Sequence, residues 1–179
     1  MNNEEKNTYM KIQMTAALLD IMKKKPAFEI FISDLQKKAK IGRVSFFRNY
    51  HRKEDILKQE LDRLIRQWGR RFEADPSSGP EGLFPSLFNF YREHREFYTI
   101  LYREGMFSIM METIIDTIRI TPDMPNLEAY MKSFWAYEIY GWLQEWIKRG
   151  MEEDGKEPKD LFAFARQKDS DSRRDNDRV

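Results

Sequence analysis

The chain of 179 residues is 41% hydrophobic and 34% charged, which suits one or two small domains with a real core. It contains no cysteine, and this excludes disulfides, thiolate chemistry and zinc sites built on cysteine. No apolar run is long enough to span a membrane, and the N-terminus carries no signal-peptide pattern. We therefore expect a cytoplasmic protein with no membrane partner.

Charge is distributed unevenly along the chain. Residues 1–58 hold 13 Lys and Arg against 7 Asp and Glu, a net +6, whereas residues 59–179 hold 18 against 23, a net −5. A basic first third fits a polyanion-binding head carried by a neutral-to-acidic body. Ordinary charge on solvated helices explains the same asymmetry without a partner, so the asymmetry matters only beside an independent signal.

The first predicted helix runs from Thr8, which would cap it, to about Lys25. Pro26 ends this helix. Lysines 23–25 either stabilise its C-terminal dipole or lie near DNA, and the sequence leaves both interpretations open. The helix carries one apolar stripe at helical spacing, formed by Ile12, Ala16, Leu19 and Met22.

Residues 30–57 predict two short helices joined by a tight corner and followed by the start of a long helix. Ile41 is the apolar residue that such a corner buries, and Gly42 is an acceptable N-cap for the second helix. Phe46 and Tyr50 are spaced i, i+4, so we expect both to face inward. A short, basic, half-exposed helix behind a tight turn is typical of a helix-turn-helix that reads duplex DNA.

This stretch resembles the DNA-binding signature of TetR/AcrR-type transcriptional regulators. With residues 30–35 leading in, the match covers about the first third of the chain. The resemblance implies an all-α fold, with a three-helix DNA-binding head and a helical-bundle body for dimerisation and ligand binding. The matching residues are Ala39, Ile41, Arg43, Ser45, Phe46, Phe47, Arg48, Tyr50, Lys53, Glu54, Asp55, Ile56 and Leu57.

Four departures from the family pattern fall on the surface that would meet DNA. Phe31 replaces a capping Thr or Ser, and Gly42 replaces a capping Ser. Lys40 replaces the turn glycine and must accept a left-handed conformation, at about 1 kcal/mol. Phe47 replaces a Tyr whose hydroxyl typically reaches a phosphate. These departures leave the fold prediction intact and keep an alternative function open, a TetR-like protein-interaction module or co-regulator that has lost specific operator binding.

The second helix of the motif would supply the contacts to the bases. Arg43, Val44 and Ser45 open that helix; an Arg there can pair with guanine, and a Val can meet a thymine methyl. Arg48 and Lys53 should touch phosphate. The predicted DNA-binding residues are Arg43, Val44, Ser45, Phe47, Arg48 and Lys53. The expected function is a dimeric regulator, a repressor, that binds double-stranded DNA at a palindromic operator and is released by a small apolar or aromatic ligand.

The rest of the chain predicts further helices and no repeat. The clearest break is the sequence DPSSGP at residues 75–80. The expected domains are 1–57 for DNA binding, 58–167 for ligand binding and dimerisation, and a disordered tail at 168–179. The expected helices are a linking helix over 53–73, then 82–104, 106–120, 125–149 and a short helix over 158–167.

Residues 84–142 are rich in aromatic and methionine side chains. Helical spacing alone explains them as core. The resemblance to TetR-like regulators favours a second interpretation, a pocket between helices for an apolar or aromatic effector. The predicted pocket residues are Tyr98, Tyr102, Met106, Met110, Phe134 and Glu138.

The helix predicted over 125–149 is apolar around most of its circumference, so it should be buried on two sides. A small domain buries one side, and a second copy of the chain is the simplest cover for the other. The predicted homodimer interface consists of Trp142, Leu143, Trp146, Leu161 and Phe162.

No arrangement of residues indicates catalysis. His51 and His94 lie far apart in sequence and have no neighbouring ligand at metal-binding spacing. The chain has no glycine-rich phosphate loop and no nucleophile elbow. We therefore expect no enzyme activity, no cofactor and no metal.

Overall fold

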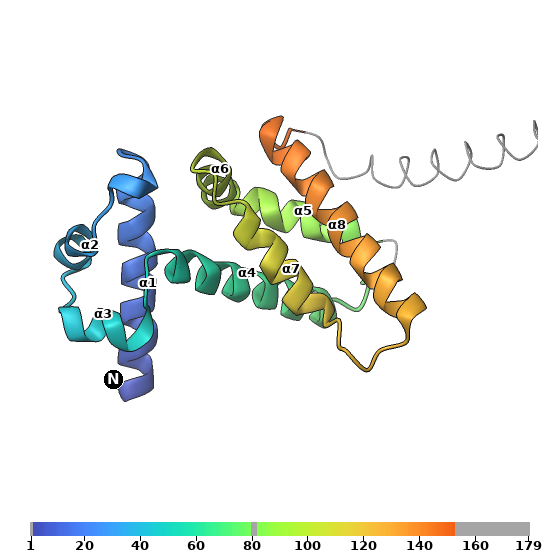
Figure 1. Cartoon of the computed structure of the whole chain (residues 1–179), viewed down its shortest axis with the longest axis horizontal. Helices are drawn as coiled ribbons and strands as arrows, with labels where there is room; N and C mark the ends of the chain where they lie inside the picture. Colours follow the sequence, from blue (N-terminus) through green and yellow to red (C-terminus); the bar gives the residue numbers. More distant parts are fainter. Residues whose placement is uncertain (1, 80–81, 153–179) are drawn as a thin grey trace, which may run out of the picture.

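A computed structural model describes residues 2–79 and 82–152, and within them it contains helices and no strand (Figure 1). This confirms the prediction of an all-α fold. The predicted helix over 158–167, its residues Leu161 and Phe162, and the tail at 168–179 lie outside the described residues. The elements are α1 (Asn3–Met22), the 3-10 turn η1 (Ala27–Glu29), α2 (Ile32–Ala39), α3 (Arg43–Asn49), α4 (Glu54–Ala74), α5 (Leu83–Glu93), α6 (Arg95–Arg103), α7 (Ser108–Ile118) and α8 (Asn126–Lys148).

The helices form two groups connected by one long helix. Helices α1 to α3, here called the head, lie at one end of the molecule, and α5 to α8, here called the body, lie at the other; α4 runs between them (Figure 1). The linking helix was predicted over 53–73, which agrees with α4 to within one residue at each end. The domain boundary predicted at residue 57 falls in the first turn of α4, so this helix belongs to both groups.

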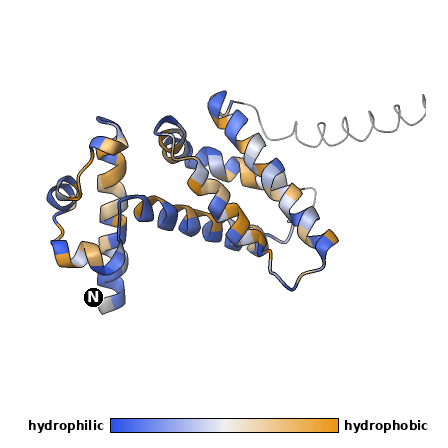
Figure 2. Ribbon diagram, in the orientation of Figure 1, coloured by the Kyte–Doolittle hydropathy of each residue, from blue (hydrophilic) through white to orange (hydrophobic). Residues whose placement is uncertain are grey.

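Hydrophobic residues occupy one side of α4 and hydrophilic residues the rest (Figure 2). Ile56, Leu57, Leu61 and Leu64 of α4 are buried. Leu61 and Leu64 follow Leu57 at i+4 and i+7, and Leu64 follows Ile56 at i+8. This spacing is that of the apolar stripe of an amphipathic helix. None of the described helices combines the length and the hydropathy that crossing a bilayer requires.

The buried face of α1 differs from the predicted one. Met14, Leu18 and Met22 point into the core, whereas Ile12 is largely exposed. Of the predicted stripe, only Met22 is fully buried, whereas Leu19 is half-buried and Ala16 is exposed. The prediction is offset because α1 carries a second apolar row, through Met14 and Leu18, and the core forms on that row. Asn2, rather than Thr8, caps this helix. The Asn2 side chain accepts a hydrogen bond from the Glu5 amide at 2.8 Å, and the Glu5 carboxylate accepts one from the Asn2 amide at 3.0 Å.

The corner between α2 and α3 has the conformation that its sequence predicts. Lys40 is left-handed, with φ 55° and ψ 42°. The following amide, that of Ile41, donates to the carbonyl of Gln36 at 3.0 Å and closes the end of α2. Lys40 thus carries a strain of about 1 kcal/mol that a glycine would not.

Lys40→Gly should stabilise the protein by about 0.5–1 kcal/mol, since relief of the left-handed strain outweighs the added freedom of the unfolded chain. Urea denaturation measures the difference in the free energy of unfolding. Lys37→Gly, in the helical backbone of α2, is the control and should destabilise by about 1 kcal/mol. If both variants are destabilised equally, Lys40 is not strained.

The helix predicted over 82–104 is two helices, so that prediction is wrong. The chain bends at His94, with φ −109° and ψ 25°, and the imidazole packs on Phe90 with ring centroids 4.7 Å apart. The Nε2 atom of His94 is buried without a hydrogen-bond partner. Burial lowers the pKa of His94, and the guanidinium groups of Arg63 and Arg71 lower it further against the opposite effect of Glu93 and Glu60.

A histidine whose pKa is lower in the folded state stabilises the fold above its unfolded pKa of about 6.5, and the contribution is lost as the pH falls below that value. The wild type should therefore lose stability between pH 7.5 and pH 5.5, and His94→Gln should lose less. Denaturation midpoints at the two pH values measure this, with the exposed His51 changed to Gln as the control. If the denaturation midpoint of His94→Gln falls with pH as much as that of the wild type, the bend does not depend on a neutral imidazole.

Candidate nucleic-acid interface

Helix α3 has one buried face and one exposed face. Phe46 and Tyr50 are buried, with ring centroids 5.8 Å apart, as their i, i+4 spacing predicts. The Tyr50 hydroxyl donates to the Gln59 side chain of α4 at 2.6 Å. Burial, with a smaller contribution from the carboxylate of Glu60, raises the pKa of Tyr50 to about 12, so this hydroxyl keeps its proton near neutral pH. These contacts set which face of α3 points outward.

The outward face of α3 combines two cations with two apolar side chains. Arg43, Arg48, Val44 and Phe47 are all exposed, with Val44 at 72% and Phe47 at 42%. The guanidinium carbon of Arg43 lies 5.4 Å from the centroid of the Phe47 ring, within reach of a cation–π interaction. Phe47 therefore positions Arg43 on the helix surface. Ser45, the remaining residue predicted to enter the groove, is half-buried.

A polar hollow of about 510 Å³ lies beside this face. It brings Lys6 and Asn7 of α1 together with Lys40 of the corner and Arg48 of α3. Three cations around one hollow suit the phosphate backbone of a nucleic acid. Lys6 and Asn7 were not among the predicted DNA-binding residues, because the first helix was predicted to begin at Thr8. The capping box between Asn2 and Glu5 is the sequence signal that places both residues on the helix.

Lys53 is engaged within the protein. Its ammonium group donates to the carbonyls of Ala27 and Ile30, the latter at 3.0 Å, and is part-buried. Only one of its three hydrogens is left for another acceptor. Its main role is therefore to fasten η1 to the start of α4, and we remove Lys53 from the candidate phosphate contacts.

The residues predicted to form an effector pocket differ widely in burial. Tyr98 and Met110 are buried in the core, whereas Phe134 lies on the outer side of α8 at 62% exposure. The rings of Tyr98 and Tyr91 pack against each other at a tilt of 48°, with centroids 4.5 Å apart. Tyr102, Met106 and Glu138 are half-buried. One carboxylate oxygen of Glu138 is buried without a hydrogen-bond partner, and burial raises the pKa of this group.

Two of the residues predicted at the dimer interface belong to the core of one protomer. Leu143 and Trp146 are 0% and 4% exposed, and the Trp146 ring lies 4.5 Å from that of Phe88. Trp142 is half-buried and packs on the same Phe88 ring, with ring centroids 4.3 Å apart. The prediction that Leu143 and Trp146 contact a partner is therefore wrong, because α5 covers this side of α8.

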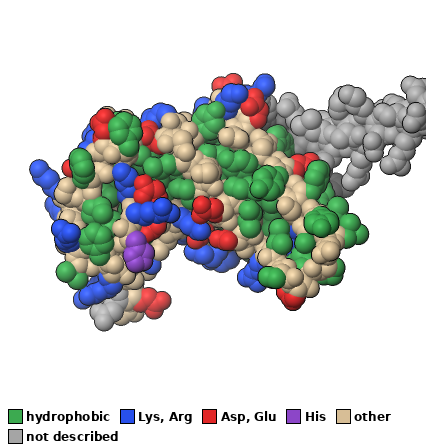
Figure 3. Space-filling model, in the orientation of Figure 1, with side chains coloured by type: hydrophobic (Ala, Val, Ile, Leu, Met, Phe, Trp, Pro, Cys, Tyr) green, Lys and Arg blue, Asp and Glu red, His purple; other side chains and the backbone are tan. Residues whose placement is uncertain are grey.

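A different part of α8 presents an apolar surface, here called the α8 patch. Figure 3 shows hydrophobic side chains gathered at this end of the molecule. The residues recur at i, i+3, i+4 and i+7 along the first half of the helix, and Gly141 continues the exposed stripe one turn further. The patch consists of Leu127 (75% exposed), Tyr130 (69%), Met131 (48%), Phe134 (62%), Trp135 (37%) and Tyr137 (63%).

In comparisons with models of known protein families and with curated protein sequences, the chain matches none of them. The resemblance to TetR/AcrR-type regulators therefore depends on the residues of α2, α3, the corner between them and the start of α4. Among residues 2–79 and 82–152, no group of three or more His, Cys, Asp or Glu side chains could hold a metal ion.

Proposed function

We propose that the protein is a dimeric, helix-turn-helix transcriptional regulator of the TetR/AcrR type, a repressor that binds duplex DNA through α3. The observation that carries the proposal is the outward face of α3, where Arg43 and Arg48 flank Val44 and Phe47 beside the basic hollow. Such a face can pair with guanine, meet thymine methyl groups and contact phosphate. The proposal is limited to DNA binding by a dimer, because the predicted effector residues range from fully buried to largely exposed.

Arg43→Ala should weaken binding to a specific duplex by about 1–3 kcal/mol and relax the preference at one base position, because a bidentate contact to guanine is lost. Arg48→Ala should weaken binding to all sequences alike and reduce the salt dependence. Gel shifts at low and moderate salt, on the DNA that flanks the protein's own gene, measure both. Specific binding that survives Arg43→Ala with its base preference intact would contradict the assignment of α3.

A second function is supported by the apolar residues exposed on the head. Phe28, Phe31 and Val44 are all more than two-thirds exposed, and Phe31 makes no capping hydrogen bond through its side chain. A surface of this kind fits a protein partner as well as a thymine-containing groove. The same gel shift separates the two functions: a protein-interaction module binds DNA without sequence preference or not at all.

We propose that the α8 patch is where two protomers associate. The exposed parts of its side chains amount to roughly 700 Å² of solvent-accessible surface. This area is near the roughly 800 Å² that each partner buries in a stable interface. It exceeds the largest apolar patch of a typical monomer. Pairing α8 with its copy about a two-fold axis would cover the patch on both protomers. At Gly141 a Cβ atom would meet nothing within 4 Å, so this position leaves room for a second helix.

Sedimentation should show a dimer at micromolar concentration, and Phe134→Glu should give folded monomers, because a carboxylate in the centre of an apolar interface has no partner. Phe28→Glu is the matched control: it places the same charge on an exposed phenylalanine of the head and should leave the dimer intact. A wild-type monomer, or a dimer that survives Phe134→Glu, would contradict the placement of the interface.

A further inference from the structure

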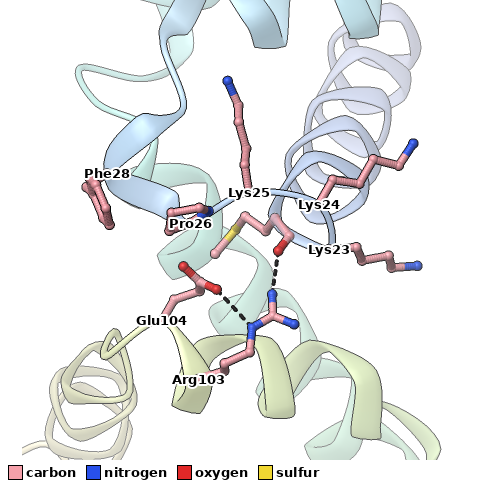
Figure 4. Close-up of a pocket in the computed structure, with 8 residues that line it drawn as sticks. Lys23, Lys24, Lys25, Pro26, Phe28, Arg103 and Glu104 are labelled. Atoms are coloured by element: carbon pink, nitrogen blue, oxygen red, sulfur yellow. Dashed lines mark hydrogen bonds and ion pairs between the residues drawn. The ribbon is translucent and has the colours of Figure 1, made fainter.

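The last turn of α6 reaches across to the head with two neighbouring side chains (Figure 4). A carboxylate oxygen of Glu104 accepts the backbone amide of Ala27 at 2.8 Å. The guanidinium group of Arg103 donates to the backbone carbonyl of Met22. The two side chains also bind each other, with 2.9 Å between Arg103 Nε and Glu104 Oε1. We call Arg103 and Glu104 the α6 clamp.

The backbone that carries the clamp is held in a fixed conformation. Gly105, directly after Glu104, is left-handed with φ 69°. Its amide donates to the Tyr102 carbonyl at 3.1 Å, and the next amide, that of Met106, donates to the Leu101 carbonyl at 2.9 Å. This is the Schellman pattern that closes a helix C-terminus. The clamp residues are thus presented by a rigid helix end.

The clamp binds groups that a helix leaves unpaired. Met22 is the last residue of α1 and Ala27 the first of η1, so the bound carbonyl and amide have no partner within their own helices. A cation at a helix C-terminus and a carboxylate at an N-terminus also match the local dipoles. The Glu104 side chain is only 9% exposed, so water competes little for its hydrogen bonds.

A second bridge between the same helices provides a comparison. Lys23 of α1 and Glu96 of α6 form an ion pair at 2.7 Å, but their side chains are 43% and 69% exposed. Exposed pairs of this kind contribute little to stability. The Lys23–Glu96 pair therefore contributes little and serves as a control for the clamp.

The segment that the clamp binds is also hydrogen-bonded to α2 and to the start of α4, the two elements on either side of α3 in the chain. The carbonyl of Ala27, whose amide is held by Glu104, is bound by Lys53 at the start of α4. Lys25 next to η1 binds the Glu29 carbonyl at 3.1 Å and the Asp34 carboxylate of α2 at 2.7 Å. The segment between α1 and α2 is thus fastened to the body, to α4 and to α2 at the same time.

We propose that Arg103 and Glu104 are positioning residues that fix the orientation of the head relative to the body, as a second connection beside α4. For its consequence on operator binding this inference rests on the proposed function. The physical reason is that α1 already packs on α4 and on α6, and hydrogen bonds away from the axis of α4 oppose rotation of the head about that helix.

Distances between spin labels test the clamp without DNA. The chain has no cysteine, so Ser33→Cys on α2 and Ser108→Cys on α7 label the head and the body, both at exposed positions. The labelled protein is diluted with unlabelled protein, so that only distances within one protomer contribute. The wild type should give one narrow distance distribution, and Glu104→Ala and Arg103→Ala should each broaden it.

The control is Glu96→Gln, which removes the exposed carboxylate on the same helix and should leave the distribution narrow. Glu104→Gln keeps an acceptor for the Ala27 amide and should fall between Glu104→Ala and the wild type. Hydrogen exchange of the Ala27 amide should follow the same order, about fivefold or more faster in Glu104→Ala. If Glu104→Ala fails to fold, Arg103→Ala and Glu104→Gln decide the question.

The proposal is overturned if clamp variants that remain folded show the distance distribution and the Ala27 exchange rate of the wild type. Binding to DNA is a separate readout: Glu104→Ala should weaken binding to a two-fold symmetric operator about tenfold, but to a single half-site less than twofold, because only the former requires two heads at a set spacing. Absence of all DNA binding would contradict the proposed function, while the distances would still decide the clamp.

Discussion

The orientation of α3 depends on the burial of two aromatic side chains. Helix α3 has seven residues and is too short to be stable by itself, so its position is set by what it packs against. Phe46 and Tyr50 supply that packing, and the hydrogen bond from Tyr50 to Gln59 ties the same helix to α4. Once these two rings face inward, helical geometry places Arg43, Val44, Phe47 and Arg48 on the outside. The candidate interface is a consequence of the core.

The same helix α4 that anchors α3 also lies against the body, so the arrangement of the body bears on the interface. The α8 patch would join two protomers and set how far apart two copies of α3 lie, while the α6 clamp would set how each head is turned. Both surfaces lie far from α3 in sequence. A regulator of the proposed type requires both, because two half-sites are read together only at a spacing of about one duplex turn.

Local patterns in the sequence predicted the features that depend on local physics. The all-helical fold, the boundaries of α4 and the inward face of α3 follow from helical spacing, whereas the left-handed Lys40 follows from the place it takes in the family pattern. The bend at His94 was missed because it contains no proline or glycine and arises from packing on Phe90. Lys53 was assigned to phosphate because the family motif supplies a residue type, whereas its bonds to Ala27 and Ile30 depend on how η1 folds back.

Predictions about which side of a helix is covered failed more often, since they depend on distant partners. Helix α8 is apolar on most sides, and its sequence alone does not tell which side meets the body. Leu143 and Trp146 pack inside the protomer, while Phe134 faces outward. The face of α1 was misplaced for a related reason, because two apolar stripes on that helix compete and α2 and α4 select one of them.

The central claim is that α3 reads duplex DNA from a two-fold symmetric dimer. Selection of binding sites from a pool of random duplexes, with the full chain at low salt, tests it most directly. We expect an enriched sequence with two inverted half-sites whose centres lie about 34–36 Å, or one helical turn, apart. Retention of duplexes with no enriched sequence, or no retention at all by the folded protein, would contradict it.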